Sequence, residues 1–138
     1  MGVGAGFLEA YERVQMNAGL GEGASAVRDL ASWKGFVAAC AEGYDDVLHE
    51  YFHDLRVRDA IERGLVAESL MGVEGFGDFC RAVRAIDEIF REIATVPISL
   101  ADPSAFSWWH HVVPGRGGED FADDLRHHFG VTIHIIEG

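Results

Sequence analysis

The hydrophobic positions of the N-terminal third recur at the three- and four-residue spacing of an α-helix. This spacing predicts a first helix over residues 7–18, which Gly19 ends. A glycine-rich stretch without periodicity follows and is typical of a loop. A second helix is expected to begin at Asp29 or Ser32 and to end before Gly43. The chain therefore opens with two amphipathic helices.

The central segment carries an apolar stripe that changes register halfway along. Its first half holds apolar residues at helical spacing: Val47, Leu48, Tyr51, Phe52 and Leu55. The next positions on that stripe are Arg58 and Asp59, whereas the apolar pattern moves round the helix to Ile61. Such a shift indicates two helices that meet near residues 53–56 rather than one straight rod.

The clearest helical stripe in the chain follows three closely spaced glycines. Asp78 stands where an N-cap is expected, and Pro97 marks the point by which the helix must end. The apolar residues of this stripe are Phe79, Cys80, Val83, Ile86, Ile89, Phe90 and Ile93. We expect this helix to be a core element, because one whole side of it is apolar.

The C-terminal third changes from helical to strand-like composition. The run from Trp108 to Val113 is short and rich in aromatic and β-branched residues, which is typical of a strand. A short helix is expected over residues 119–128, ended by Gly130, and a final strand over residues 131–136. The expected fold is α+β and mostly helical, with four to six helices. A small C-terminal two-stranded sheet with an intervening short helix completes a single globular domain, residues 1–138.

The net charge narrows the classes of partner. The chain has 23 acidic against 11 basic residues, a formal charge of −12. Such a field repels phosphate backbones and anionic lipid headgroups, so roles at nucleic acids or membrane surfaces are disfavoured. A basic protein or a cation is the natural complement, although acidity can also serve solubility alone.

Cysteine usage and hydropathy bear on the compartment. Cys40 and Cys80 each fall on the apolar side of an expected helix, and we interpret them as buried free thiols of a reducing compartment. No apolar run reaches the ~18 residues that would cross a bilayer. The N-terminus also lacks the basic segment and apolar core of a secretory signal. The expected location is the cytoplasm.

One string matches a known chemistry. The residues from His49 to His53, HEYFH, fit H-E-x-x-H, which on a helix places two imidazoles one turn apart as zinc ligands and Glu50 as the base for a bound water. The segment also resembles the metzincin pattern, H-E-x-x-H-x-x-G-x-x-H or D. Asp59 stands at the third ligand position of that pattern, and Arg56 replaces its glycine. This resemblance covers eleven residues and implies a zinc-dependent hydrolase.

The same positions support a second interpretation, in which both histidines belong to a polar helix face. At about 100° per residue, His49 and His53 point away from the apolar stripe. Glu42, Asp46 and Glu50 project in a similar direction, which makes this face acidic. On this interpretation the protein needs no metal or other cofactor, and the face contacts solvent or a basic partner.

Further candidates lie in the C-terminal third. Trp108 and Trp109 are adjacent on an expected strand, so one indole faces solvent unless both faces of the sheet are covered. An exposed tryptophan is a usual anchor of protein interfaces, whereas two buried ones simply fill the core. The expected short helix adds an acidic cluster: Glu119, Asp120, Asp123 and Asp124.

Two functional hypotheses follow. The first is a small acidic interaction or inhibitor module, similar in kind to immunity proteins and antitoxins, that binds a basic protein partner. Its candidate interaction residues are Glu42, Asp46, Glu50, Trp108, Trp109, Asp120, Asp123 and Asp124. The second is a small zinc-dependent hydrolase with His49, His53 and Asp59 as ligands and Glu50 as base. We favour the first, because the charge excess is large and the motif stands alone.

Overall fold

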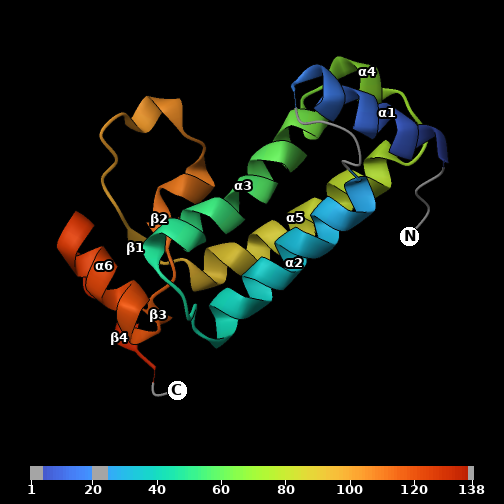
Figure 1. Cartoon of the computed structure of the whole chain (residues 1–138). Helices are drawn as coiled ribbons and strands as arrows, with labels where there is room; N and C mark the ends of the chain where they lie inside the picture. Colours follow the sequence, from blue (N-terminus) through green and yellow to red (C-terminus); the bar gives the residue numbers. More distant parts are fainter. Residues whose placement is uncertain (1–4, 20–24, 137–138) are drawn as a thin grey trace. The chain divides into compact units, whose positions relative to one another are not determined.

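A computed structural model describes residues 5–19 and 25–136 of the chain. Over these residues the fold is α+β and mostly helical, as the hydrophobic pattern predicts (Figure 1). The helices are α1 (Ala5–Asn17), α2 (Ala26–Glu42), α3 (Leu48–Leu65), α4 (Glu68–Met71), α5 (Phe76–Ile93) and α6 (Glu119–Phe129).

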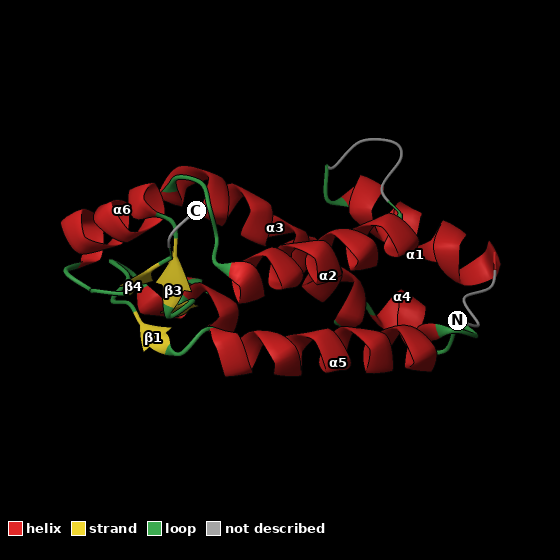
Figure 2. Ribbon diagram, turned by 90° about the horizontal axis from the view of Figure 1, so that it is seen from below, coloured by secondary structure: helices red, strands yellow, loops and turns green. Residues whose placement is uncertain are grey.

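Short strands and 3-10 turns occupy the C-terminal third. Strand β1 (Val96–Pro97) pairs antiparallel with β2 (Val112–Val113), and β3 (Arg116–Gly117) pairs parallel with β4 (His134–Ile135). The helix α6 lies between β3 and β4 in the chain and contacts both of them, as Figure 2 shows. Two 3-10 turns, Pro103–Ala105 and Trp108–His110, lie between β1 and β2 in the chain.

The helix ends follow the glycines. Gly19, Gly43 and Gly130 all have positive φ and stand where α1, α2 and α6 finish, so these three predicted ends are confirmed. The start of α2 lies earlier than predicted, because the Arg28 backbone N–H donates to Ser25 Oγ (3.3 Å) in the manner of an N-cap. Asp29 instead accepts a hydrogen bond from the Tyr11 hydroxyl (2.7 Å).

Two local predictions were wrong in the C-terminal third. The residues from Trp108 to His110 form a 3-10 turn rather than a strand, and Val112–Val113 pairs with β1 instead of the last strand. The last strand pairs with β3, which lies between the expected strand and the expected short helix, where no strand was predicted. Gly117 of β3 permits the close packing of α6, because a Cβ at this position would lie 2.6 Å from the Phe121 ring.

The predicted break in the central segment was also wrong. The helix α3 runs without interruption from Leu48 to Leu65. Arg58, whose charge suggested the break, is only 3% exposed and is bound by Asp87 of α5. The polar side chain is therefore part of the buried face of α3. Asp78, the expected N-cap of α5, lies inside that helix, which begins at Phe76.

The described residues group into two compact units. Unit 1 holds those up to Gly35 together with Arg56–Asp87, and unit 2 holds Phe36–Leu55 together with those from Glu88 onward. In unit 1, aromatic rings fill the core where α1 packs, with Phe7 and Phe79 5.2 Å apart and Tyr11 and Phe79 5.5 Å apart. Helices α1 and α4 lie side by side within this unit (Figure 1).

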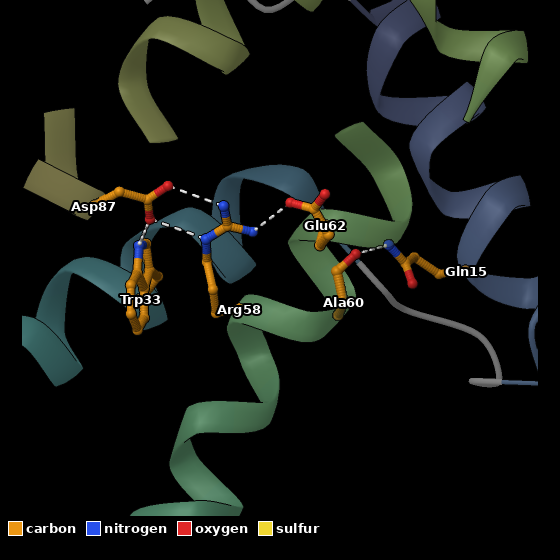
Figure 3. A network of polar contacts seen from close by, with 6 residues as sticks. All are labelled: Gln15, Trp33, Arg58, Ala60, Glu62 and Asp87. Atoms are coloured by element: carbon orange, nitrogen blue, oxygen red, sulfur yellow. Dashed lines mark hydrogen bonds and ion pairs between the residues drawn. The ribbon is translucent and has the colours of Figure 1, made fainter. Parts of the chain in front are cut away.

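A polar network completes the core of unit 1 (Figure 3). Arg58 donates from Nε and Nη2 to the two carboxylate oxygens of Asp87, each at 2.9 Å. Trp33 Nε1 donates to the same carboxylate at 3.0 Å. Gln15, which is fully buried, donates to the Ala60 carbonyl at 2.7 Å. These donors and acceptors are mutually satisfied, so the network is a structural element.

Unit 2 has its own aromatic core. Phe121 of α6 lies 5.0 Å from Tyr51 of α3 and 5.2 Å from Tyr44, measured between ring centroids. Phe36 of α2 lies 5.3 Å from the same Tyr51 ring. The Gly118 N–H donates to the Tyr44 carbonyl at 2.8 Å, which fixes the α2–α3 connection against β3. This connection is the part of unit 2 on which the candidate site is built.

Candidate functional site

The negative charge of the chain is concentrated in unit 2. Its residues include 13 acidic side chains against three arginines, a formal charge of −10 out of −12 for the whole chain. Unit 1 is close to neutral, with ten acidic and eight basic side chains. The segment Phe36–Leu55 alone has five acidic residues and no lysine or arginine. An attraction for cations is therefore a property of unit 2.

An acidic cleft lies at the α2–α3 connection. It has a volume of about 320 Å³ and is lined by Ala39, Glu42, Gly43, Tyr44, Asp45, Asp46 and Asp54. Four of these described lining residues are acidic and none is basic. The cleft forms because Gly43, with φ of 112°, turns the chain sharply out of α2 and brings Asp45 and Asp46 back beside it.

Tyr44 anchors one wall of the acidic cleft. Its ring is buried, and its hydroxyl donates a 2.8 Å hydrogen bond to Asp54 Oδ2 of α3. Burial raises the pKa of the Tyr44 hydroxyl well above its ordinary value, and the hydrogen bond and charge of Asp54 raise it further. The phenol therefore stays neutral and holds the Asp54 carboxylate in place. This arrangement presents fixed negative charge, and the neutral phenol is a poor nucleophile.

An apolar groove lies beside the first turn of α3, next to helix α6. It has a volume of about 470 Å³ and is lined by Val47, Leu48, His49, Phe52, Asp124, His128 and Phe129. The Leu48 backbone N–H donates to Asp124 Oδ2 at 3.0 Å, so a side chain of α6 caps the start of α3. The ring centroids of Phe52 and Phe129 lie 6.3 Å apart.

The predicted acidic residues do not all lie together. Glu42 and Asp46 line the acidic cleft, although Asp46 belongs to the connection and not to a helix. Glu50 is half-buried on α3 and is not among the residues that line the cleft. On α6, Asp124 lines the apolar groove and Asp120 is exposed. Asp123 is half-buried and pairs with Arg126 at 2.8 Å.

The two histidines of the H-E-x-x-H motif lie on an exposed face of α3, and Glu50 between them is half-buried. His49 and His53 are both exposed, and only His49 lines the apolar groove. Asp59, the third ligand of the metzincin pattern, is half-buried and belongs to unit 1, whereas the histidines belong to unit 2. Across residues 5–19 and 25–136, no group of three or more His, Cys, Asp or Glu side chains is arranged to hold a metal ion.

The two tryptophans have different environments. Trp109 is 2% exposed and is a core residue of unit 2. Trp108 is half-buried, and the guanidinium of Arg91 lies 3.8 Å from its ring centroid in a cation–π contact. One face of the Trp108 indole is thus already occupied by a cation of the same chain, which leaves less of it for a partner.

The cysteines also differ from each other. Both are free thiols, and Cys40 is buried whereas Cys80 is half-buried. Burial raises the pKa of the Cys40 thiol from 9.0 to about 12, and the nearby Asp54 charge acts in the same direction. A thiol with such a pKa stays protonated at neutral pH and is a poor nucleophile.

Tyr44, Asp45 and Asp54 in the cleft and Phe129 in the groove were not among the residues predicted from the sequence. The adjacent acids at 45 and 46, directly after a glycine that ends a helix, were the available signal for the cleft. Phe129 carries no comparable signal, because it lies more than seventy residues from the start of α3. Its contribution depends on the packing of α6 and is visible only in the structure.

No protein family, characterised protein or solved structure shows a significant match to this chain. Among the helices that the structure describes, none combines the length and apolar character needed to cross a membrane.

Proposed function

We propose that this chain is a protein-binding module that engages a basic protein partner through the acidic cleft of unit 2. The supporting observation is a cluster of four carboxylates around one hollow: Glu42, Asp45, Asp46 and Asp54. None of the described residues that line this hollow is basic. Opposite charge at a protein interface speeds association and selects partners.

The kind of module that fits best is a small inhibitor that covers the basic surface of its target, in the manner of immunity proteins and antitoxins. A net charge of −10 in unit 2 favours a cationic surface and disfavours nucleic acid and anionic lipid. The fixed Tyr44–Asp54 pair supports the same proposal, because a preorganised carboxylate costs less to bind than a mobile one.

Affinity capture tests this proposal. The tagged protein is incubated with an extract of the organism that encodes it, alongside a Glu42→Gln, Asp46→Asn double variant. A Glu68→Gln, Glu74→Gln double variant is the matched control, since both residues are exposed in unit 1 and the charge change is the same.

The expected result is one stoichiometric basic protein held by the wild type and the control but not by the cleft variant. Raising the salt concentration from about 0.05 M to about 0.5 M should release it, because screening weakens exposed charge pairs. Recovery of no basic protein, or equal recovery by all three forms, would contradict the proposal.

A further inference from the structure

The apolar groove is the feature that the acidic cleft does not explain. It is built on the same short segment of unit 2, because Val47 and Leu48 follow Asp46 directly in the chain. Val47 is 37% exposed and stands between Asp46 and Leu48 in the chain. A hollow with apolar walls and a polar rim is the usual form of a site for an apolar group.

The groove is already formed in the free protein. The Leu48–Asp124 hydrogen bond ties α3 to α6, and Phe121 packs against both Tyr44 and Tyr51 below the connection. The Phe52–Phe129 contact forms part of one wall. An occupant therefore does not have to open the groove, which lowers the free-energy cost of binding.

The negative charge around the apolar groove determines which kind of occupant fits it. Asp45 and Asp46 lie beside the groove in the chain, and Asp124 lines it. A second copy of this chain would bring another unit of charge −10 to the same place, so self-association is opposed by repulsion. A neutral apolar segment would fill the groove but would gain nothing from the negative charge of the neighbouring carboxylates. A segment that combines an apolar side chain with cationic side chains matches both the apolar groove and the acidic cleft.

We propose that the apolar groove receives an aliphatic or aromatic side chain from a basic amphipathic segment of the protein partner, whose arginine or lysine side chains enter the neighbouring acidic cleft. This inference rests on the proposed function and adds the partner's recognition chemistry. The groove supplies specificity, since many basic surfaces match the charge but few also present an apolar anchor at the right place.

Binding of two isomeric peptides tests the inference. The probes are fluorescein-labelled, amidated peptides of leucine and arginine with identical composition. One has leucine at helical spacing, and the other has the same residues in scrambled order. The amphipathic peptide should bind about tenfold tighter than the scrambled one, because seating a leucine side chain contributes roughly that factor. Charge alone predicts equal affinities.

Matched variants separate the two halves of the site. Val47→Ser and Phe129→Ala should each remove the preference for the amphipathic peptide while leaving the affinity for the scrambled peptide unchanged. Val66→Ser is the control, because Val66 is 60% exposed in unit 1 and lines neither hollow. Circular dichroism shows whether each variant is folded. If Phe129→Ala does not fold, Val47→Ser is sufficient for the test.

The outcomes distinguish the two proposals. Equal binding of both peptides, lost in the Glu42→Gln, Asp46→Asn variant, would overturn the groove inference and leave the proposed function standing. Binding of neither peptide would count against both. Sedimentation of the free protein completes the test, since self-association abolished by Val47→Ser would assign the groove to a second copy and overturn the inference.

Discussion

Arg58 of α3 and Asp87 of α5 form a bidentate ion pair inside unit 1, with both nitrogen–oxygen distances at 2.9 Å. The arginine is 3% exposed and the aspartate 8%. Trp33 donates to the same carboxylate, and Glu62 pairs with the remaining side of the guanidinium at 3.1 Å. The planar guanidinium matches the carboxylate in a way that a lysine ammonium would not.

Removing one partner of this pair should destabilise the protein strongly. Arg58→Met leaves the Asp87 carboxylate buried with the Trp33 indole N–H as its remaining donor among the described residues, and the expected loss is about 3–5 kcal/mol of unfolding free energy. Urea denaturation measures it. Adding Asp87→Asn should restore part of the loss, because asparagine is neutral and still accepts from Trp33. Equal stabilities of the single and double variants would refute this account.

An exposed ion pair provides the control. Arg126 and Asp123 lie 2.8 Å apart on α6, with side chains 64% and 47% exposed. Arg126→Met should change the unfolding free energy by less than about 1 kcal/mol, because water screens the pair and already solvates both groups.

The Arg58–Asp87 pair also shows where reading the fold from the sequence fails. Hydrophobic periodicity and glycine correctly placed the ends of α1, α2 and α6, because these depend on neighbours in the chain. The same pattern wrongly predicted a break in the middle of α3, because a charged residue is taken to be exposed unless its partner is known. That partner is 29 residues away, on another helix. Likewise, β3 pairs with a strand that follows α6 in the chain, and α6 packs closely on Gly117, neither of which composition reveals.

The candidate site was predictable to a similar extent. Glu42 and Asp46, which the sequence placed on one face, both line the acidic cleft, although the helical angle used to join them does not apply across the connection at Gly43. Asp54 lines the same cleft, and the Tyr44 hydroxyl donates a hydrogen bond to its carboxylate. The groove combines the start of α3 with the end of α6, so no local pattern could have indicated it.

Loss of the Asp124 cap should loosen α3. Asp124→Ala removes the acceptor for the Leu48 N–H, and the expected cost is about 1 kcal/mol of unfolding free energy, within the range for lost helix caps. Asp124→Asn keeps an acceptor oxygen and should retain most of the stability. Urea denaturation and amide hydrogen exchange at residues 48–50 measure the effect. Equal losses in the two variants would indicate that charge, and not the cap, matters.

The zinc-hydrolase hypothesis has a direct test in metal content. Protein purified without added zinc should contain substoichiometric metal, and a His49→Ala, His53→Ala variant should contain the same amount, because both rings are exposed. Elemental analysis of the two forms measures this. One equivalent of metal that the double variant loses would favour the hydrolase, and Glu50→Gln should then keep the metal but abolish hydrolysis.

Alkaline pH should unfold the protein through its buried phenols. Burial raises the pKa of Tyr11, Tyr44 and Tyr51 above the ordinary value of 10.0, and hydrogen bonds to Asp29 and Asp54 raise the pKa of the first two further. Burial likewise raises the pKa of Cys40 from 9.0 to about 12.

The unfolded chain ionises these groups first, so the stability present at neutral pH is lost as the pH rises above about 9 for Cys40 and above about 10 for the tyrosines. Each tyrosine should contribute a slope of about 1.4 kcal/mol per pH unit there. Urea denaturation between about pH 8 and about pH 11 measures the slope, and Tyr44→Phe should reduce it by one phenol's share. Tyrosinate absorbance that grows near pH 10 while the helical circular dichroism signal persists would contradict the prediction.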